Sequence, residues 1–573
     1  MKTGSERPLI PMAVLAAISA LLLSGTALGA RIQVLDPHYQ LVIPVKDSPL
    51  PGCNGATIGR DGALYVVHGA AGMASRIDLK TMRATTFVPP YAGVFIPDDI
   101  TADEEGNFYV TGTTPLVGEV YRIDRNGMKA VIARGFKGPN GIQYNPRTGR
   151  LFMTECFWGN GIYELDPSGC REPRLIVPEN VIAVPEGFGF DPDTQDLIVP
   201  DLGSGKILRV DPDTGHITTI MEDLWMPVAL KVGPDKRAYF TELVSGAVYR
   251  ITLDGQKRDK LAQLPPGLDN LAITPDGRLF VTSCWDSTIY EVSTDGSGIY
   301  KVLFPKGPNQ IGGILAKGGE ILISDSVTIH HVKNGKYART SLSVWTTVGM
   351  PIPCGLADGP GDEVFWTDWM GNAVAIGSPF TGECKRVAER LDRPVAALMN
   401  KVGTKLYIAE YGSGQITEIN LQDGVKKVMA TGLEGPLALA IVKDKLYVAE
   451  AKAGRISKVD PDSGKQEVFL AGIVGRPGAL GDDGRGNLLV LDGAGQKLYR
   501  IGTQDLGISL LAANLPIRYV LTGTYPALEL PWPMSVSKEG NIYLATANRG
   551  VIMLQKIRPT GPSRGHPMSP RRE

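Results

Sequence analysis

The sequence predicts an all-β protein that repeats one four-stranded unit along almost its whole length. Most units begin with a Pro-x-Gly or Pro-x-Ala turn. They continue with short strands rich in Val, Ile, Tyr and Phe, separated by Asp-Gly, Gly-Ser or equivalent turns. The opening turn recurs about every 40 residues, and no stretch has the 3.6-residue apolar spacing of an amphipathic helix. Four short antiparallel strands repeated in this way are typical of β-propeller blades.

Twelve such units lie between about Pro51 and Ile557. Because propellers usually have about 4 to 8 blades, twelve units favour two six-bladed rings, at 30–306 and 307–557. A single ring and two interleaved rings are the alternatives. The last unit shows three clear strands, and the strand predicted at 40–45 either supplies its fourth strand or closes the first ring locally.

The two ends of the chain differ from the repeats. Residues 1–29 have two basic residues, an apolar stretch at 12–23 and Ala-Leu-Gly at 27–29, which predicts a secretory signal peptide. We therefore expect a periplasmic or secreted protein with no membrane span after cleavage, and a retained signal anchor is the alternative. The tail 558–573 is rich in Pro, Arg and Ser and is predicted to be disordered.

Charge and cysteine usage exclude several classes of function. Lys+Arg 59 against Asp+Glu 60, without a long basic run in the repeats, argues against nucleic-acid binding. Export would permit disulfides, and the pairs Cys156 with Cys170 and Cys354 with Cys384 each fall within one unit; buried free thiols are the alternative. The sequence has no CxxC, GxSxG, HExxH, P-loop or dinucleotide motif in a credible setting.

One position of the unit, the residue after the opening proline or its equivalent in units without that proline, changes its chemical character between the two halves. In the first six units it is Asn54, Asp98, Asn140, Glu186, Val228 and Asp269, and in the last six it is Gln310, Cys354, Val395, Leu437, Gly478 and Met534. Equivalent positions of successive blades converge on one central channel. Carboxylate and amide oxygens suit Ca²⁺ or Mg²⁺, so we predict a metal site formed by Asn54, Asp98, Asn140, Glu186 and Asp269. The alternative is that each side chain caps its own turn.

Several other residues are candidates for the same site. Asp99 and Asn270 lie one residue further on and are the ring members if the register is shifted by one. His68 is a candidate general base, with an exposed loop histidine as the alternative. The aromatic residues Phe157, Trp158, Trp225 and Trp285 are predicted either to wall a substrate pocket or to pack between blades.

Acidic residues also follow the second strand of many units in both halves. We predict that they cap turns and link blades, with Glu155 and Asp201 able to support the metal site. They are Glu155, Asp201, Glu242, Asp325, Asp368, Glu410, Glu450 and Asp492.

The turns at 139–142 and 185–188, with the Leu-Tyr-Ile/Val-Ala-Glu strands at 406–410 and 446–450, resemble the SMP-30/gluconolactonase group and the related NHL-repeat and virginiamycin B lyase-like propellers. This resemblance implies a divalent cation at the channel mouth, held by a Glu, two Asn and an Asp, that activates water against a lactone or ester. Asn140 resembles one of the two amides, and Glu186 or Asp269 resembles an acidic ligand. The chain departs from the group at Asn54, where a glutamate is expected, and in having a second propeller.

The leading hypothesis is an exported double propeller whose first ring binds Ca²⁺, with Mg²⁺ or Zn²⁺ as alternatives, and hydrolyses a lactone, an ester or a sugar-derived substrate. Asp98 or Glu186 would accept the proton from water. The alternatives are a metal-dependent lyase of the virginiamycin B lyase type and a non-catalytic NHL-type scaffold that binds a protein or glycan.

Overall fold

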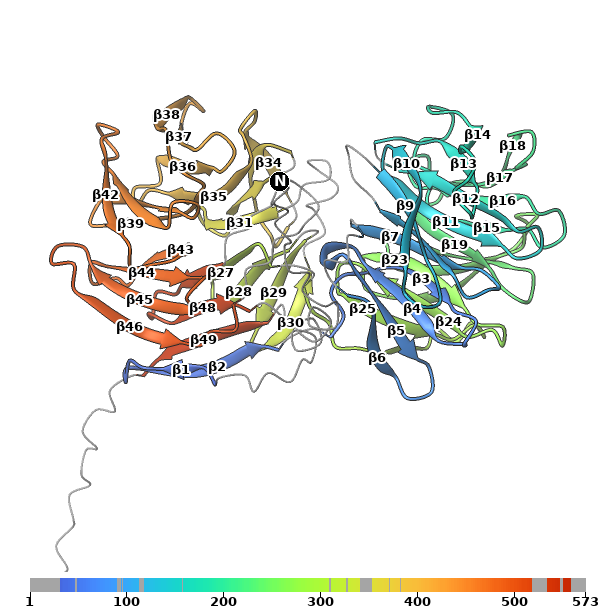
Figure 1. Cartoon of the computed structure of the whole chain (residues 1–573), viewed down its shortest axis with the longest axis horizontal. Helices are drawn as coiled ribbons and strands as arrows, with labels where there is room; N and C mark the ends of the chain where they lie inside the picture. The colour runs from blue at the N-terminus through green and yellow to red at the C-terminus, as the bar shows by residue number, and fades with distance from the viewer. Residues whose placement is uncertain are drawn as a thin grey trace, which may run out of the picture.

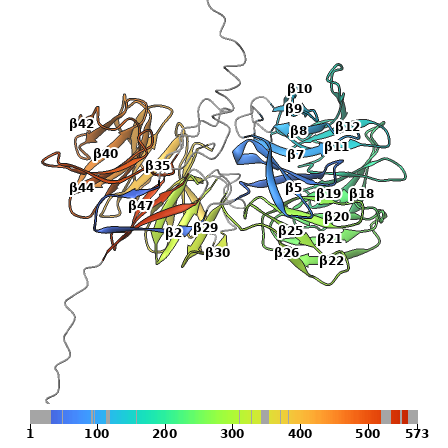
Figure 2. The ribbon, with the colours of Figure 1, turned by 60° about the horizontal axis from the view of Figure 1, so that its bottom comes forward.

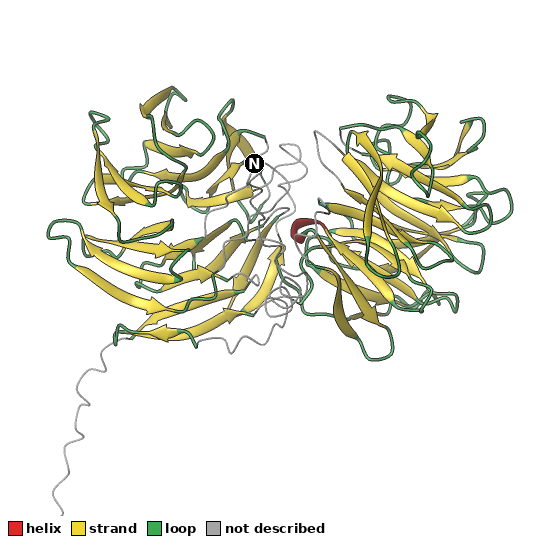
Figure 3. Cartoon of the chain, in the orientation of Figure 1, coloured by secondary structure: helices red, strands yellow, loops and turns green. Residues whose placement is uncertain are grey.

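The computed structural model describes residues 31–46, 49–89, 94, 96–112, 118–156, 158–308, 311–325, 328–340, 353–369, 371–381, 383–517, 533–546 and 550–557. The predicted signal peptide and tail, together with Gln310 and Phe157, lie outside these residues. The described strands form twelve antiparallel sheets, and the helical structure among these residues is one 3₁₀ turn, η1 (Gly69–Ala71) (Figure 3). The described part of the chain has no helix long and apolar enough to cross a membrane. The predicted all-β fold of twelve four-stranded blades is confirmed.

The first six sheets are blades 1 to 6, each formed by four consecutive strands (Figure 1). Blade 1 is β3 (Cys53–Ile58), β4 (Leu64–His68), β5 (Met73–Asp78) and β6 (Arg83–Val88); blade 2 is β7 (Pro97–Ala102), β8 (Phe108–Gly112), β9 (Gly118–Ile123) and β10 (Lys129–Phe136); blade 3 is β11 (Pro139–Asn145), β12 (Arg150–Glu155), β13 (Ile162–Leu165) and β14 (Arg174–Val177); blade 4 is β15 (Gly189–Phe190), β16 (Leu197–Asp201), β17 (Lys206–Val210) and β18 (Ile217–Met221); blade 5 is β19 (Pro227–Val232), β20 (Ala238–Glu242), β21 (Ala247–Ile251) and β22 (Arg258–Gln263); blade 6 is β23 (Leu268–Ile273), β24 (Leu279–Ser283), β25 (Thr288–Val292) and β26 (Tyr300–Val302). The first strands of neighbouring blades contact one another, and β23 contacts β3, so these blades close into a ring.

Blades 7 to 12 form the second ring. Blade 7 is β27 (Gly313–Lys317), β28 (Glu320–Ser324), β29 (Ile329–Lys333) and β30 (Lys336–Thr340); blade 8 is β31 (Pro353–Asp358), β32 (Val364–Asp368), β33 (Ala373–Gly377) and β34 (Cys384–Ala388); blade 9 is β35 (Pro394–Met399), β36 (Lys405–Glu410), β37 (Gln415–Asn420) and β38 (Lys426–Ala430); blade 10 is β39 (Pro436–Val442), β40 (Lys445–Glu450), β41 (Arg455–Val459) and β42 (Gln466–Ala471); blade 11 is β43 (Pro477–Asp482), β44 (Asn487–Asp492), β45 (Lys497–Gly502) and β46 (Ile508–Ala513); blade 12 is β47 (Met534–Val536), β48 (Ile542–Ala545) and β49 (Val551–Lys556) with β2 (Tyr39–Val45). Contacts of β27 with β31 and β47 close this ring.

The N-terminal strands belong to sheets of the second ring (Figure 2). Strand β2 pairs antiparallel with β49, Tyr39 opposite Lys556 and Leu41 opposite Leu554, and β1 (Gln33–Val34) pairs with β46. The strand predicted at 40–45 therefore supplies the fourth strand of the last blade and does not close the first ring. In sequence, blades 1 to 6 are inserted between β2 and β27.

The cores lie between neighbouring blades, which explains the uninterrupted apolar runs of the second strands. In blade 3, Phe152 packs with Phe188 and Leu197 of blade 4 in one buried cluster. In blade 3 the first strand approaches blade 4 so closely that a side chain is excluded at Gly141. A Cβ on Gly141 would lie 2.8 Å from the Glu186 carbonyl oxygen, so glycine is needed at this position.

Candidate functional site

A shift in strand pairing brings the turn positions of the first ring toward the channel. In blade 3, Pro139 pairs with Glu155, but the next pair is Ile142 with Met153, so the pairing slips between them. Blades 1, 2 and 6 show the same irregularity in their first strand pair. Such bulges re-aim side chains. We call the end of the ring that carries Asn54, Asp98, Asn140, Glu186 and Asp269 the mouth.

Threonines of the second strands fix the backbone of these turns. The Thr111 hydroxyl donates to the carbonyl oxygen of Asn140 at 2.6 Å, and Thr154 donates to that of Glu186 at 3.2 Å. Thr282 closes the ring by donating to the Asn54 carbonyl at 2.7 Å. Each bond crosses from one blade to the next and holds a predicted site residue by its main chain.

Three carboxyl groups of the mouth influence one another. Glu186 is buried, and Asp98 and Asp269 keep a small accessible part. Loss of water raises the pKa of Asp98 and of Glu186 well above their usual values, and the charge of Asp269 raises both further. Burial also raises the pKa of Asp269 to about 7. The charges of these groups therefore act on one another across the mouth.

No cationic side chain among the described residues offsets these three carboxyl groups. Asn54 donates its Nδ2–H to Asp98 Oδ1 at 3.1 Å. The Asn54 Oδ1 atom is buried and accepts no hydrogen bond from any described residue. A cation would satisfy an unpaired buried oxygen that lies beside excess negative charge.

Two thiols also lie at the mouth, and sequence reasoning did not place them there. The Cys156 thiol donates to Glu186 Oε1 at 3.1 Å, and the Cys284 thiol forms a hydrogen bond with Asp269. Burial first and the neighbouring carboxyl groups second raise the pKa of both thiols. The signal was available, because each cysteine closely follows the second strand of its blade.

The predicted disulfides of Cys156 with Cys170 and of Cys354 with Cys384 do not form. Cys156 is buried at the mouth, whereas Cys170 is exposed on a turn whose amide groups bind Asp166. Cys354 is likewise buried and Cys384 is only partly covered.

Asp99 and Asn270 form a second polar layer. Asp99 accepts hydrogen bonds from Asn270 Nδ2 at 2.9 Å and from the Ile142 amide at 3.1 Å. Lys231 Nζ lies 3.7 Å from Asp99 Oδ2 and donates to Gln143 Oε1 at 2.7 Å. Both residues therefore lie inside the ring, but protein groups already satisfy their side chains. Lys231 was not predicted, although it is the single charge in the apolar strand 227–232.

The expectation that His68 is an exposed loop residue is wrong. It ends β4, is fully buried, and its Nε2 lies 2.8 Å from Ser75 Oγ. Glu410 and Glu450 occupy the same place in their blades and contact Thr417 and Ser457, also seven residues further on. His68 thus takes the place of a structural acid, and its role as a general base stays a prediction.

The prediction that acids after the second strand hold turns is confirmed for several of them, whereas the bonds that follow do not test the predicted links between blades. Glu155 accepts from the Lys137 amide at 2.7 Å, Asp201 from the Val184 amide at 2.8 Å, and Glu242 from the Trp225 amide at 3.0 Å. Each bond holds the connector that enters the same blade. Of the aromatic candidates, Trp285 is fully buried, whereas Trp158 and Trp225 are exposed.

The second ring fills the corresponding place with apolar side chains. Cys354, Val395 and Leu437, at the turn positions, form one buried cluster with Trp369 and Tyr411. The described turn positions of the second ring, which do not include Gln310, thus lack the carboxylate and amide side chains of the first ring.

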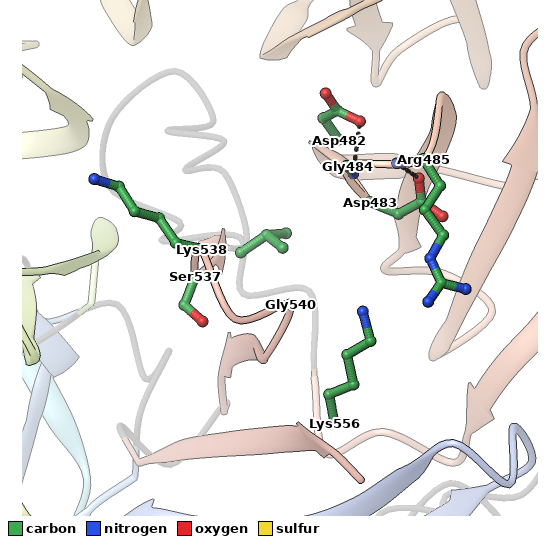
Figure 4. A pocket seen from close by; sticks show the side chains of 9 residues that line it. Asp482, Asp483, Gly484, Arg485, Ser537, Lys538, Gly540 and Lys556 are labelled. Atoms are coloured by element: carbon green, nitrogen blue, oxygen red, sulfur yellow. Dashed lines mark hydrogen bonds between the residues drawn. The ribbon is translucent and has the colours of Figure 1, made fainter. Parts of the chain in front are cut away.

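Two cavities lie on the second ring, away from the mouth. One, of about 350 Å³, is lined by Asp482, Asp483, Arg485, Lys538 and Lys556, and Arg485 and Lys556 extend toward each other across it (Figure 4). The other, of about 600 Å³, lies between β2, Pro305 and Tyr337. Neither cavity contains a predicted site residue.

The donor chemistry of the mouth fits a hard divalent cation, because it combines carboxylate and amide oxygens. The carboxyl groups alone do not form a ready site: no three His, Cys, Asp or Glu side chains of the described residues are arranged to hold one ion. A cation would therefore also need the amide oxygens of Asn54 and Asn140.

Comparison with known proteins gives partial similarities. No family model matches the chain. It is 24% identical over 192 residues to a gluconolactonase of Zymomonas mobilis, covering 28% of this chain and 53% of that protein. It is 22% identical over 187 residues to the protein STRICTOSIDINE SYNTHASE-LIKE 13 of Arabidopsis thaliana, covering 29% and 46%. The chain therefore spans about half the length of the curated relatives it matches.

Among solved structures, the GH74 xyloglucanase of Xanthomonas campestris aligns with a TM-score of 0.43 and 13% identity over 90% of this chain and 99% of that one. The tricorn protease aligns with a TM-score of 0.33 and 15% identity over 81% and 49%. The twelve sheets and the sequence similarities together identify the chain as a β-propeller protein with weak homology to gluconolactonase and strictosidine synthase-like proteins.

Proposed function

We propose that the mouth of the first ring binds a divalent cation, with Ca²⁺ best suited, and hydrolyses a lactone or an ester. The observation that carries this proposal is the excess of Asp98, Glu186 and Asp269 without a cationic partner among the described residues, beside the unsatisfied Oδ1 of Asn54. In the same ring Asp99, by contrast, has the cationic side chain of Lys231 nearby. The similarity to a gluconolactonase favours lactone chemistry.

In this proposal Asn54, Asn140 and the three carboxylates hold the ion. A bound cation supplies Lewis acidity, which lowers the pKa of water and polarises a carbonyl group. The Glu186 carboxyl group is held in a fixed orientation, because the Cys156 thiol donates a hydrogen bond to one of its oxygens. Asp98 or Glu186 would take the proton from water.

A non-catalytic binding scaffold is the second candidate function. The observation that favours it is that no three acidic, cysteine or histidine side chains of the described chain are poised around one point. In that case the mouth recognises a cationic group of a partner or ligand and performs no chemistry.

Calorimetric titration of Ca²⁺ tests the site. The wild type should bind one ion, and the variant Asp98→Asn/Glu186→Gln should lose binding at least 100-fold because it removes two charged oxygen ligands. Asp193→Asn removes an exposed carboxylate of the first ring and should bind like the wild type. Equal affinity of all three proteins would eliminate the metal site.

Turnover separates the two candidate functions. A panel of lactones and esters should be hydrolysed by the Ca²⁺-loaded wild type and not by the double variant. Binding of Ca²⁺ without any turnover above the double variant would favour the scaffold.

A further inference from the structure

Large apolar side chains are exposed on the loops around part of the mouth. Trp158 is 37% exposed, Val181 58% and Trp225 59%. They belong to the loop after β12, the connector into blade 4 and the connector into blade 5. These loops lie at the mouth end of their blades, because the first strand starts there and the second strand ends there. We call the three residues the apolar rim.

Hydrogen bonds join the loop segments that carry the three rim residues. Asn160, two residues after Trp158, donates to the Ala183 carbonyl at 3.3 Å and accepts from the Asn180 amide at 2.8 Å. The next loop, after β16, reaches the connector of blade 5, where the Leu224 amide donates to the Gly205 carbonyl at 3.0 Å. Val181 thus lies on a segment that joins the surroundings of Trp158 and Trp225.

The rim residues are close in sequence to residues of the mouth. Trp158 lies two residues after Cys156, whose thiol contacts Glu186 at 3.1 Å. Val181 lies five residues before Glu186 itself. Trp225 lies three residues before the turn position Val228, and its backbone amide donates a hydrogen bond to Glu242 at 3.0 Å.

The sector of the mouth beneath Trp225 is also apolar. Val228 forms a buried cluster with Leu243, Val244 and Trp285, and Leu202 and Met226 pack against it. Blade 5 is the one blade of the first ring whose turn position carries no oxygen. The mouth therefore has a polar side and an apolar side.

We propose that the apolar rim binds the aromatic or alkyl group of an ester or lactone whose carbonyl group lies among the mouth carboxylates, so that the substrate class is apolar esters and lactones. This inference rests on the proposed hydrolysis at the same site. Exposed aromatic and aliphatic side chains beside a polar centre mark a ligand site. A polyhydroxylated ring would need free hydrogen-bonding groups on the rim, but Asn160, Asp201 and Glu242 already serve the connectors.

Kinetics with matched substrates test the proposal. Dihydrocoumarin presents an aromatic ring and glucono-δ-lactone presents hydroxyl groups. In the Ca²⁺-loaded protein, Trp158→Ala/Trp225→Ala should raise KM for dihydrocoumarin about tenfold through lost aromatic contacts, with little change in kcat. Leu175→Ala, which removes a side chain 48% exposed on the outer strand of blade 3, is the control and should behave like the wild type. An unchanged KM in the double variant, or a wild type that prefers glucono-δ-lactone, would overturn the proposal.

A binding measurement keeps the rim testable if no lactone is hydrolysed. Coumarin should bind the wild type in calorimetry and should bind the double tryptophan variant about tenfold more weakly. Ca²⁺ affinity should stay equal in both proteins, which shows that the mouth is intact. Failure of the wild type to bind coumarin refutes the apolar substrate even where Ca²⁺ binds. Sedimentation of the wild type, but not of the variant, as a dimer or with phosphatidylcholine vesicles would instead assign the rim to a second copy or a lipid surface.

Discussion

At the scale of single residues, the mouth differs from the layer beneath it in how negative charge is balanced. Asp99 has Lys231, Asn270 and a backbone amide around it. Asp98, its neighbour in sequence, has only the Asn54 amide among the described residues, and its pKa is raised by burial and by Asp269 and Asp99. Two adjacent residues of β7 thus differ in their surroundings: Asp99 is bonded to other blades, and Asp98 lies at the mouth.

Stability of the metal-free protein should fall as the pH rises toward neutrality. The pKa of Asp269 is raised from about 4 to about 7 on folding, so between these values the folded state holds a proton that the unfolded state has lost. The free energy of unfolding therefore decreases with pH in this window. Urea denaturation in a chelator should show that the wild type loses about 2 kcal/mol more than Asp269→Asn between pH 5 and pH 8. Parallel pH profiles would contradict the assignment.

Calcium should reverse this loss. A ligand that binds only the folded state adds about 2.7 kcal/mol at 100 times its Kd. Thermal unfolding at pH 8 should shift upward with Ca²⁺ in the wild type and much less in Asp98→Asn/Glu186→Gln. Because bound carboxylates must be ionised, the same titration should release protons below pH 7, detectable in buffers of different ionisation enthalpy. An equal shift in both proteins would mean that Ca²⁺ binds elsewhere.

At the scale of the elements, the site is held by bonds between blades. Thr154 of β12 donates to the Glu186 carbonyl, and Thr111 of β8 donates to the Asn140 carbonyl. These threonines occupy the same place in the second strand, immediately before the terminal residue. The scaffold therefore positions the turn backbone independently of the side chains that would bind a ligand.

Thr154→Val should keep the shape of the core and remove the hydrogen bond to Glu186. We expect a loss of about 1 kcal/mol in the free energy of unfolding, together with weaker Ca²⁺ binding because Glu186 is less well fixed. Thr367→Val removes the equivalent hydroxyl in the second ring, where it accepts from the Gly355 amide at 2.8 Å. It should cost similar stability without changing Ca²⁺ affinity. Equal Ca²⁺ affinity in both variants would show that this bond does not tune the site.

The sequence was sufficient to predict the blades and the polar mouth, because both depend on local repetition. One repeat position identifies the mouth residues Asn54, Asp98, Asn140, Glu186 and Asp269. Their blades face one channel, because Thr282 bonds to Asn54 of the next blade and Asn54 bonds to Asp98 of the blade after it. The pairing slip at 139–142 could not be read from the pattern, so Asp99 and Asn270 remained undecided. The contact of Cys156 with Glu186 joins two segments that meet only in the folded ring, and the contact of His68 with Ser75 depends on the pairing of two strands. Neither contact could be read from the repeat pattern. Metal binding and export stay predictions.

At the scale of the whole molecule, one ring is inserted into the other. Blades 1 to 6 are continuous in sequence from β3 to β26, whereas the last blade of the second ring needs β2 from the other end of the chain. The two rings therefore depend differently on the N-terminal segment, although both are six-bladed.

Removal of residues 31–46 should destabilise the second ring and leave the first ring folded. The deletion exposes the edge of β49 and removes its pairing with β2. We expect one thermal transition to fall sharply while the transition that responds to Ca²⁺ stays in place. A fragment 49–308, which contains blades 1 to 6, should bind Ca²⁺ like the whole protein. Loss of both transitions in the deletion variant would show that the rings unfold as one unit.

The pairing of Tyr39 with Lys556 also sets an order of events in time. A ribosome completes every strand of the first ring by Val302, long before β49 exists, so that ring can close while the rest of the chain is still being made. Strand β2, by contrast, must wait unpaired until β49 has been made. The pairing of Tyr39 with Lys556 spans a long stretch of sequence, and such contacts slow folding. Closure of the second ring is therefore expected to be a late step, completed when β2 pairs with β49.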